Sequence, residues 1–108
     1  MVWGVEMKDL CLSLLSVMID DLREENKLQI QKWGVQDHEA SEWMMFLTEE
    51  IGELAQAISE WQYRNGHERN VFNEAIQSAT LALKIAEMFK KEESERLIDD
   101  YLSSEIED

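Results

Sequence analysis

The chain almost lacks the residues that interrupt helices. Its 108 residues contain no Pro and only four Gly, and these two residues cost a helix interior more than any others. The strong helix formers Ala, Leu, Glu, Lys, Gln and Met are plentiful. A hydrophobic fraction of 44% is ordinary for a folded protein and too high for a disordered one. The sequence therefore predicts an all-α protein, with residues 1–108 forming a single helical domain.

Polar stretches around two of the glycines divide the chain. Gly34 and Gly66 each separate segments whose apolar residues recur with the period of a helix. The predicted helices span residues 5–32, 41–64, 69–90 and 93–104. Ser41 is the expected N-cap of the second helix, and the basic pair Lys90 and Lys91 suits the end of the third. Short connections are typical of an up-and-down four-helix bundle, and oligomerisation is expected to complete the core of such a short chain.

The balance of charge excludes several classes of partner. Ten basic residues against 24 acidic residues give a formal net charge of −14. Such a surface repels nucleic acids and anionic membranes, so neither is an expected partner. It also repels nucleoside triphosphates unless divalent cations bridge the two. The alternative is that the charge only keeps the protein soluble.

The apolar stretch between Leu10 and Ile19 does not read as a targeting or membrane segment. It is too short to span a bilayer, and Asp20 and Asp21 follow it directly. It also lacks the basic start and the cleavage site of a signal peptide. Cys11, the only cysteine, has no partner for an internal disulfide and is expected to be a buried, reduced thiol. These features predict a cytoplasmic location.

Acidic residues of the second predicted helix fall where a helical wheel places apolar side chains. At about 100° per residue, Glu50 lies within the apolar stripe, Glu53 lies at its margin and Glu49 lies outside it. A carboxylate in an apolar seam is costly unless it is neutralised. Glu50 and Glu53, three residues apart, can direct oxygens at one cation. Neutralisation by a Lys or Arg of another helix is the open alternative.

The third predicted helix adds another carboxylate. Glu74 aligns with one of two apolar stripes of that helix, and a helix that is apolar on two sides is usually buried between neighbours. Glu74 is therefore expected to face the interior or a second subunit, where it would meet Glu50 and Glu53. Three adjacent carboxylates cannot all ionise without a cation. Ligation by oxygen alone favours Mg²⁺ or Mn²⁺.

These residues resemble the motif of a known family. Glu49-Glu50-x-x-Glu53, followed by Glu74-x-x-Gln77, is similar to the pattern E-E-x-x-E…E-x-x-D of the MazG-like, all-α nucleoside triphosphate pyrophosphohydrolases. The segment from residue 32 to 38, Lys-Trp-Gly-Val-Gln-Asp-His, resembles one found ahead of this motif in small members of the family. The resemblance covers about residues 25–90.

The resemblance implies a fold, an activity and a set of ligands. It implies a MazG-like bundle that uses Mg²⁺, or Mn²⁺, to hydrolyse a (d)NTP to a (d)NMP and pyrophosphate. Glu50, Glu53, Glu74 and Gln77 match the metal ligands, and Glu49 and Glu50 match the catalytic positions. Glu49 would hold the attacking water or orient a ligand. Gln77 replaces the Asp of the pattern, and an amide supplies an oxygen without charge, so metal affinity should fall.

Four further residues are candidates for substrate binding, namely Lys32, Trp33, His38 and Lys84. The two lysines would contact phosphates, although solvated lysines are common. Trp33 and His38 would stack on the base, or Trp33 would cap one end of the bundle. The expected assembly is a homodimer or a homotetramer, and a close helix crossing at Gly52 would account for a glycine in a helix interior. A tolerated surface glycine is the alternative there.

Two other functions compete with the enzyme. One is a catalytically weakened MazG-like module that binds a nucleotide or a protein partner without turnover, and Gln77 is its main support. The other is a purely structural oligomer whose acidic face is solvated. Thermal stabilisation by Mg²⁺ would separate this last possibility from the other two, because only a ligand that binds the native state stabilises it.

Overall fold

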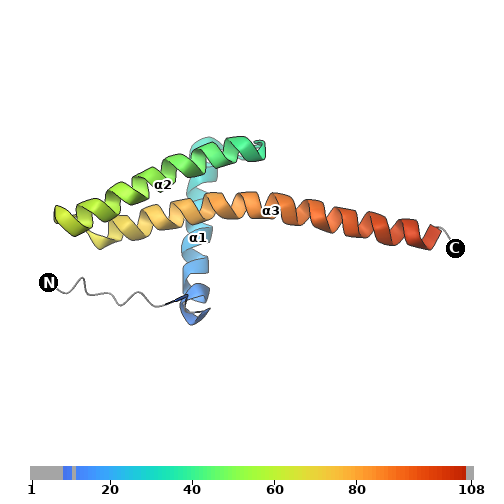
Figure 1. The fold of residues 1–108 in the computed structure, drawn as a ribbon, viewed down its shortest axis with the longest axis horizontal. Helices are drawn as coiled ribbons and strands as arrows, with labels where there is room; N and C mark the ends of the chain where they lie inside the picture. The colour runs from blue at the N-terminus through green and yellow to red at the C-terminus, as the bar shows by residue number, and fades with distance from the viewer. Residues whose placement is uncertain (1–8, 11, 107–108) are drawn as a thin grey trace.

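Three helices make up the described part of the chain (Figure 1). The computed structural model describes residues 9–10 and 12–106, which contain α1 (Leu12–Trp33), α2 (Ala40–Tyr63) and α3 (Glu68–Ile106). The all-α prediction is confirmed for these residues, which include no strand. The predicted helix start at residue 5 and the prediction for Cys11 lie outside the described residues.

The two longer helices form an antiparallel pair that α1 crosses. In Figure 1, α2 runs alongside the first half of α3, and α1 passes behind them at a steep angle. The backbone of α1 approaches α3 but has no Cα atom within 8 Å of α2. Among the described residues, no helix is both long enough and apolar enough to cross a membrane.

The predicted break between a third and a fourth helix is wrong. α3 continues for 39 residues, because its sequence contains no Gly or Pro to end it. The expected breakpoint is bridged within the helix: Lys90 Nζ lies 3.8 Å from Glu93 Oε1, and Ser94 Oγ donates to the Lys90 carbonyl at 2.9 Å. The described part of one chain therefore does not form the up-and-down four-helix bundle. Residues 92–106, here called the C-terminal arm, extend beyond α1 and α2 (Figure 1).

The start of α2 also differs from the prediction. The N-cap is Glu39, with extended φ and ψ of −69° and 157°, and not Ser41. The Glu39 N–H donates to Oε1 of Glu42 at 3.1 Å. A Glu three residues after the cap satisfies an otherwise unpaired backbone donor in this way. In return, the Glu39 side chain accepts a hydrogen bond from the Glu42 backbone N–H. This pair of hydrogen bonds places the helix start at Ala40.

A sharp turn fixes the pairing of α2 with α3. Asn65 has a φ of 59°, and the Gly66 N–H donates to the Glu60 carbonyl at 2.8 Å. A Cβ built on Gly66 would lie 2.9 Å from the backbone of Glu60 and Trp61. Only glycine fits so close an approach. The turn therefore sets which residues of α2 and α3 face each other.

The interior of the single chain is small. Among the residues whose burial is described, the buried apolar ones are Trp43, Ala57 and Leu81, and many large apolar side chains on all three helices are exposed. Ser78 and Thr80 are also buried, and their hydroxyls donate to carbonyls one turn earlier in α3. The described chain thus holds its helices together with few buried apolar contacts.

Replacing Gly66 by Ala should lower the free energy of unfolding by more than about 1 kcal/mol, because the new Cβ would clash with backbone atoms. Gly52→Ala is the matched control: nothing lies within 4 Å of a Cβ there, and Ala is better than Gly by about 1 kcal/mol in a helix. Urea unfolding followed by circular dichroism measures both. Equal stability of the two variants would contradict the role of the turn.

Candidate functional site

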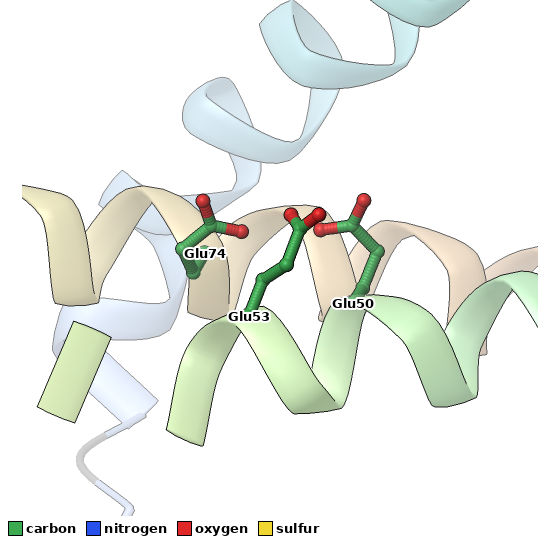
Figure 2. Close-up of side chains that lie close together, drawn as sticks. All are labelled: Glu50, Glu53 and Glu74. Atoms are coloured by element: carbon green, nitrogen blue, oxygen red, sulfur yellow. The ribbon is translucent and has the colours of Figure 1, made fainter. Parts of the chain in front are cut away.

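Three carboxylates meet where α2 and α3 run side by side (Figure 2). Glu50 and Glu53 lie one helical turn apart on α2, and Glu74 lies opposite them on α3. One oxygen from each residue can be chosen so that all three lie within 4.8 Å of one another. Glu50 and Glu74 are half-buried, and Glu53 is exposed. The structure therefore brings together the three acidic residues that the sequence singled out.

The crowding of negative charge changes the protonation of this cluster. Burial raises the pKa of Glu50 from 4.5 to about 7, and Glu53 and Glu74 add to the effect. Burial also raises the pKa of Glu74, while its hydrogen bond with Glu50 acts in the opposite direction. Like charges in a partly desolvated site favour the neutral form. Glu50 is consequently protonated in part of the molecules at neutral pH.

The amide of Gln77 lies against the same carboxylates. With its nitrogen turned toward them, it donates to Glu50 Oε2 at 2.9 Å and to Glu74 Oε2 at 3.3 Å. Gln77 is thus at the position expected of a fourth ligand. In this orientation it supplies hydrogen-bond donors that partly offset the repulsion between the carboxylates.

A groove of about 1000 Å³ opens beside the cluster. Its wall is formed by the C-terminal half of α1, the following loop, the first half of α2 and the middle of α3. The groove is lined by all the other predicted site residues, namely Glu49, Lys32, Trp33, His38 and Lys84. Glu49 is exposed and lies outside the three-carboxylate group.

An aromatic group forms part of this wall. His38, Trp43 and Phe46 pack edge to face, with ring centroids 4.8 Å apart for His38–Trp43 and 5.1 Å for His38–Phe46. His38 Nε2 lies 2.7 Å from Gln36 Oε1, and its Nδ1 lies 3.5 Å from Glu42 Oε2. Of these three rings, only His38 was among the site residues predicted from the sequence.

A polar chain of side chains connects α1 to α3 at the groove. Lys84 Nζ donates to Gln29 Oε1 at 2.5 Å, and Gln29 Nε2 donates to Glu25 Oε2 at 2.8 Å. The ammonium also lies 5.2 Å from the centroid of the Trp43 ring. Burial lowers the pKa of Lys84, and Glu25 opposes that shift. Lys84 is therefore a cation held in place by residues from all three helices.

Gln29 was not identified from the sequence, although a signal for it was present. It is buried in the structure. It follows Leu15 and Leu22 at intervals of seven residues, so it interrupts an apolar row of α1. A polar side chain in such a row requires a partner, and here the partners are Lys84 and Glu25.

Lys32 and Trp33 lie at the exposed rim of the groove. Trp33 is 56% exposed, and Lys32 Nζ lies 4.7 Å from the centroid of its ring. This cation–π contact holds the lysine over the indole face. Trp33 therefore contributes an aromatic surface at the rim and is not part of the small core.

The donor set of the cluster suits a hard divalent cation. It consists of carboxylate oxygens with one amide oxygen available from Gln77, and Mg²⁺ prefers such ligands. Adjacent octahedral ligands at about 2.1 Å from Mg²⁺ lie about 3.0 Å apart, so the three oxygens, which lie within 4.8 Å of one another, would have to move closer together to bind one ion. No family model matches the chain, and no curated protein or solved structure matches it. The site is therefore interpreted from its own residues.

The raised pKa of Glu50 predicts a pH dependence of stability. The folded state holds a proton that the unfolded state loses above its pKa of 4.5, so this contribution is lost as the pH rises toward 7 and beyond. Without divalent cations, the Tm of the wild-type chain should fall between pH 5 and pH 8. The Tm of Glu50→Gln should fall less over the same range. Differential scanning fluorimetry measures both. An identical slope in the variant would show that the general negative charge alone is responsible.

Gln77→Asp tests the ligand position directly. A fourth carboxylate should lower the Tm without metal, because it removes the amide donors to Glu50 and Glu74 and adds like charge. It should also enlarge the Tm increase caused by Mg²⁺. Gln56→Asp, an exposed position of α2, is the control for the added charge. A larger Mg²⁺ response in the control than in Gln77→Asp would contradict the placement of Gln77 in the site.

Proposed function

We propose that this chain is a Mg²⁺-dependent nucleoside triphosphate pyrophosphohydrolase of MazG-like type, which converts a (d)NTP to a (d)NMP and pyrophosphate. The observation that carries the proposal is the cluster of Glu50, Glu53 and Glu74 beside a large groove. Repelled by a net charge of −14, a triphosphate needs cations at the point where it binds. The acidic cluster would hold those cations beside the groove.

The acidic residues divide between two roles in the proposal. Glu50, Glu53 and Glu74 would hold Mg²⁺, with the Gln77 amide reoriented to offer its oxygen. The ion would neutralise phosphate charge and make the scissile phosphorus a better electrophile. Glu49, an exposed carboxylate of the groove wall, would accept a proton from the water that attacks the α-phosphorus. The bond to the β-phosphate oxygen breaks, and pyrophosphate leaves.

The groove offers groups for the rest of the substrate. Lys84 is fixed by Gln29 and would contact a phosphate as a positioned cation, and Lys32 would do so at the rim. Trp33 is exposed at the rim, and His38 belongs to the aromatic group in the wall. Both would contact the base by stacking.

The proposed active form is a homodimer or homotetramer. A second copy would supply the helices that a four-helix bundle needs and that the described part of one chain lacks. It would also cover some of the exposed apolar side chains. A cytoplasmic location belongs to the same proposal and rests on the sequence features given above.

The Gln77 hydrogen bonds favour one second candidate. The amide satisfies Glu50 and Glu74 without a cation, as expected of a module that keeps the bundle but has lost tight metal binding. Such a module would bind a nucleotide, or a protein partner, without turnover. Isothermal calorimetry that detects nucleotide binding with no cleavage would favour this candidate.

Pyrophosphate release with a panel of canonical and modified (d)NTPs, in Mg²⁺ and in Mn²⁺, tests the enzyme. Glu50→Gln should lower kcat by at least about a hundredfold, because the site loses a charged metal ligand. Glu60→Gln, an exposed position on the same helix, should keep full activity. Circular dichroism checks that both variants stay helical. Absence of any monophosphate from the wild-type chain would refute the enzyme.

A further inference from the structure

Gln29 is a buried polar residue in the wall of the groove, and the proposed chemistry gives it no contact with the substrate. It is 8% exposed, and it belongs to the part of α1 that lines the groove. Its amide oxygen accepts from Lys84 Nζ of α3, and its amide nitrogen donates to Oε2 of Glu25, one turn earlier in α1. A buried amide that is bonded at both ends has one orientation. Gln29 is therefore a fixed acceptor for a flexible lysine.

Contacts with two other helices hold the Lys84 ammonium in the groove. Gln29 of α1 accepts from it at 2.5 Å, and the centroid of the Trp43 ring of α2 lies 5.2 Å away. Lysine has a flexible stem of four carbons, so these contacts restrict where its charge lies. An ammonium has three N–H donors, and Gln29 accepts one of them. The contact with Gln29 therefore leaves donors for a bound anion.

The amide of Gln29 also separates Lys84 from a carboxylate. Glu25 is the charged group that raises the pKa of Lys84 against the lowering effect of burial. Gln29 bridges the two charges, because its oxygen bonds the ammonium and its nitrogen bonds the carboxylate. The attraction between opposite charges falls with the distance between them. Without the amide, Lys84 would be free to turn toward Glu25 and form an ion pair that cancels its charge in the groove.

The position of Lys84 relative to the acidic cluster suits a chain of linked phosphates. Lys84 follows Gln77 by seven residues on α3, and Trp43 precedes Glu50 by seven residues on α2. Seven residues make two helical turns, or about 10 Å along the helix axis. All four side chains line the same groove. A ligand with several phosphates can thus be held by a cation at the cluster and by the ammonium further along the groove.

We propose that Gln29 is a positioning residue, which keeps the Lys84 ammonium apart from Glu25 and available to a phosphate of the Mg²⁺-bound triphosphate. The inference rests on the proposed function for the identity of that ligand. Lys84 would contact the phosphate in the bound substrate and in the transition state alike. A contact of this kind lowers KM and leaves kcat unchanged.

Steady-state kinetics of pyrophosphate release separate these two parameters. Gln29→Met keeps a long, unbranched side chain with good helix propensity and removes both hydrogen bonds. It should raise KM for the (d)NTP by about tenfold, the effect of losing one charged hydrogen bond, and change kcat by less than about twofold. Gln31→Met, at an exposed position of the same helix, is the matched control and should change neither. An unchanged KM, or a fall in kcat as large as the rise in KM, overturns the proposal.

A double-mutant cycle distinguishes positioning from a structural role. Lys84→Met removes the cation itself and should raise KM at least as much as Gln29→Met does. Because Gln29 acts through Lys84, the double variant should have the KM of Lys84→Met alone. Thermal unfolding followed by circular dichroism measures any loss of stability separately. Effects on KM that multiply would show that Gln29 acts only on the fold, and they overturn the proposal.

Calorimetry with inorganic tripolyphosphate and Mg²⁺ tests the same inference without turnover. The wild-type chain and Gln31→Met should bind it equally, and Gln29→Met and Lys84→Met should each bind about tenfold more weakly. If this pattern is found but no (d)NTP yields a monophosphate, the pyrophosphohydrolase is refuted and the role of Gln29 in holding an anion stands. If (d)NTPs are hydrolysed but Gln29→Met binds tripolyphosphate like the wild-type chain, only the role of Gln29 is refuted. Absence of binding by the wild-type chain also overturns that role.

Discussion

The antiparallel packing of α2 on α3 is the contact on which the rest of the structure depends. The turn at Gly66 sets its register, because no larger residue fits against the Glu60 backbone. Most of the small buried interior, including Trp43 and Leu81, belongs to these two helices. The same register brings Glu74 beside the acidic pair of α2. Stability and the candidate site therefore arise from a single helix pair.

That contact also carries an electrostatic cost. Three carboxylates placed together repel one another, and the raised pKa of Glu50 is the direct consequence. The Gln77 amide offsets part of this repulsion, and a divalent cation would offset more. A cluster of like charges that is unfavourable for the folded protein is typical of functional positions, where local rules of stability are broken.

α1 completes the groove with little help from apolar burial. Its connection to α3 includes the hydrogen bond from Lys84 to buried Gln29. The orientation of the Gln29 amide is fixed, because its oxygen accepts from Lys84 and its nitrogen donates to Glu25. Trp43 of α2 lies next to the same ammonium. Polar contacts of this kind orient a helix more than they stabilise it. Large apolar side chains of α1 and of the C-terminal arm remain exposed in the single chain.

The sequence by itself determined the helical class, the breaks at Gly34 and Gly66, and the alignment of Glu50 with Glu53, since these follow from local backbone preference and from about 100° of rotation per residue. It also indicated that Glu74 belongs with them. Local rules were insufficient at Lys90, where favourable C-terminal charges do not end a helix that lacks a breaker. The partners of Gln29, the aromatic wall around Trp43 and the groove itself were decided only by the tertiary structure. They depend on the angle at which α1 crosses α3, and that angle is set by packing between helices rather than by any one of them.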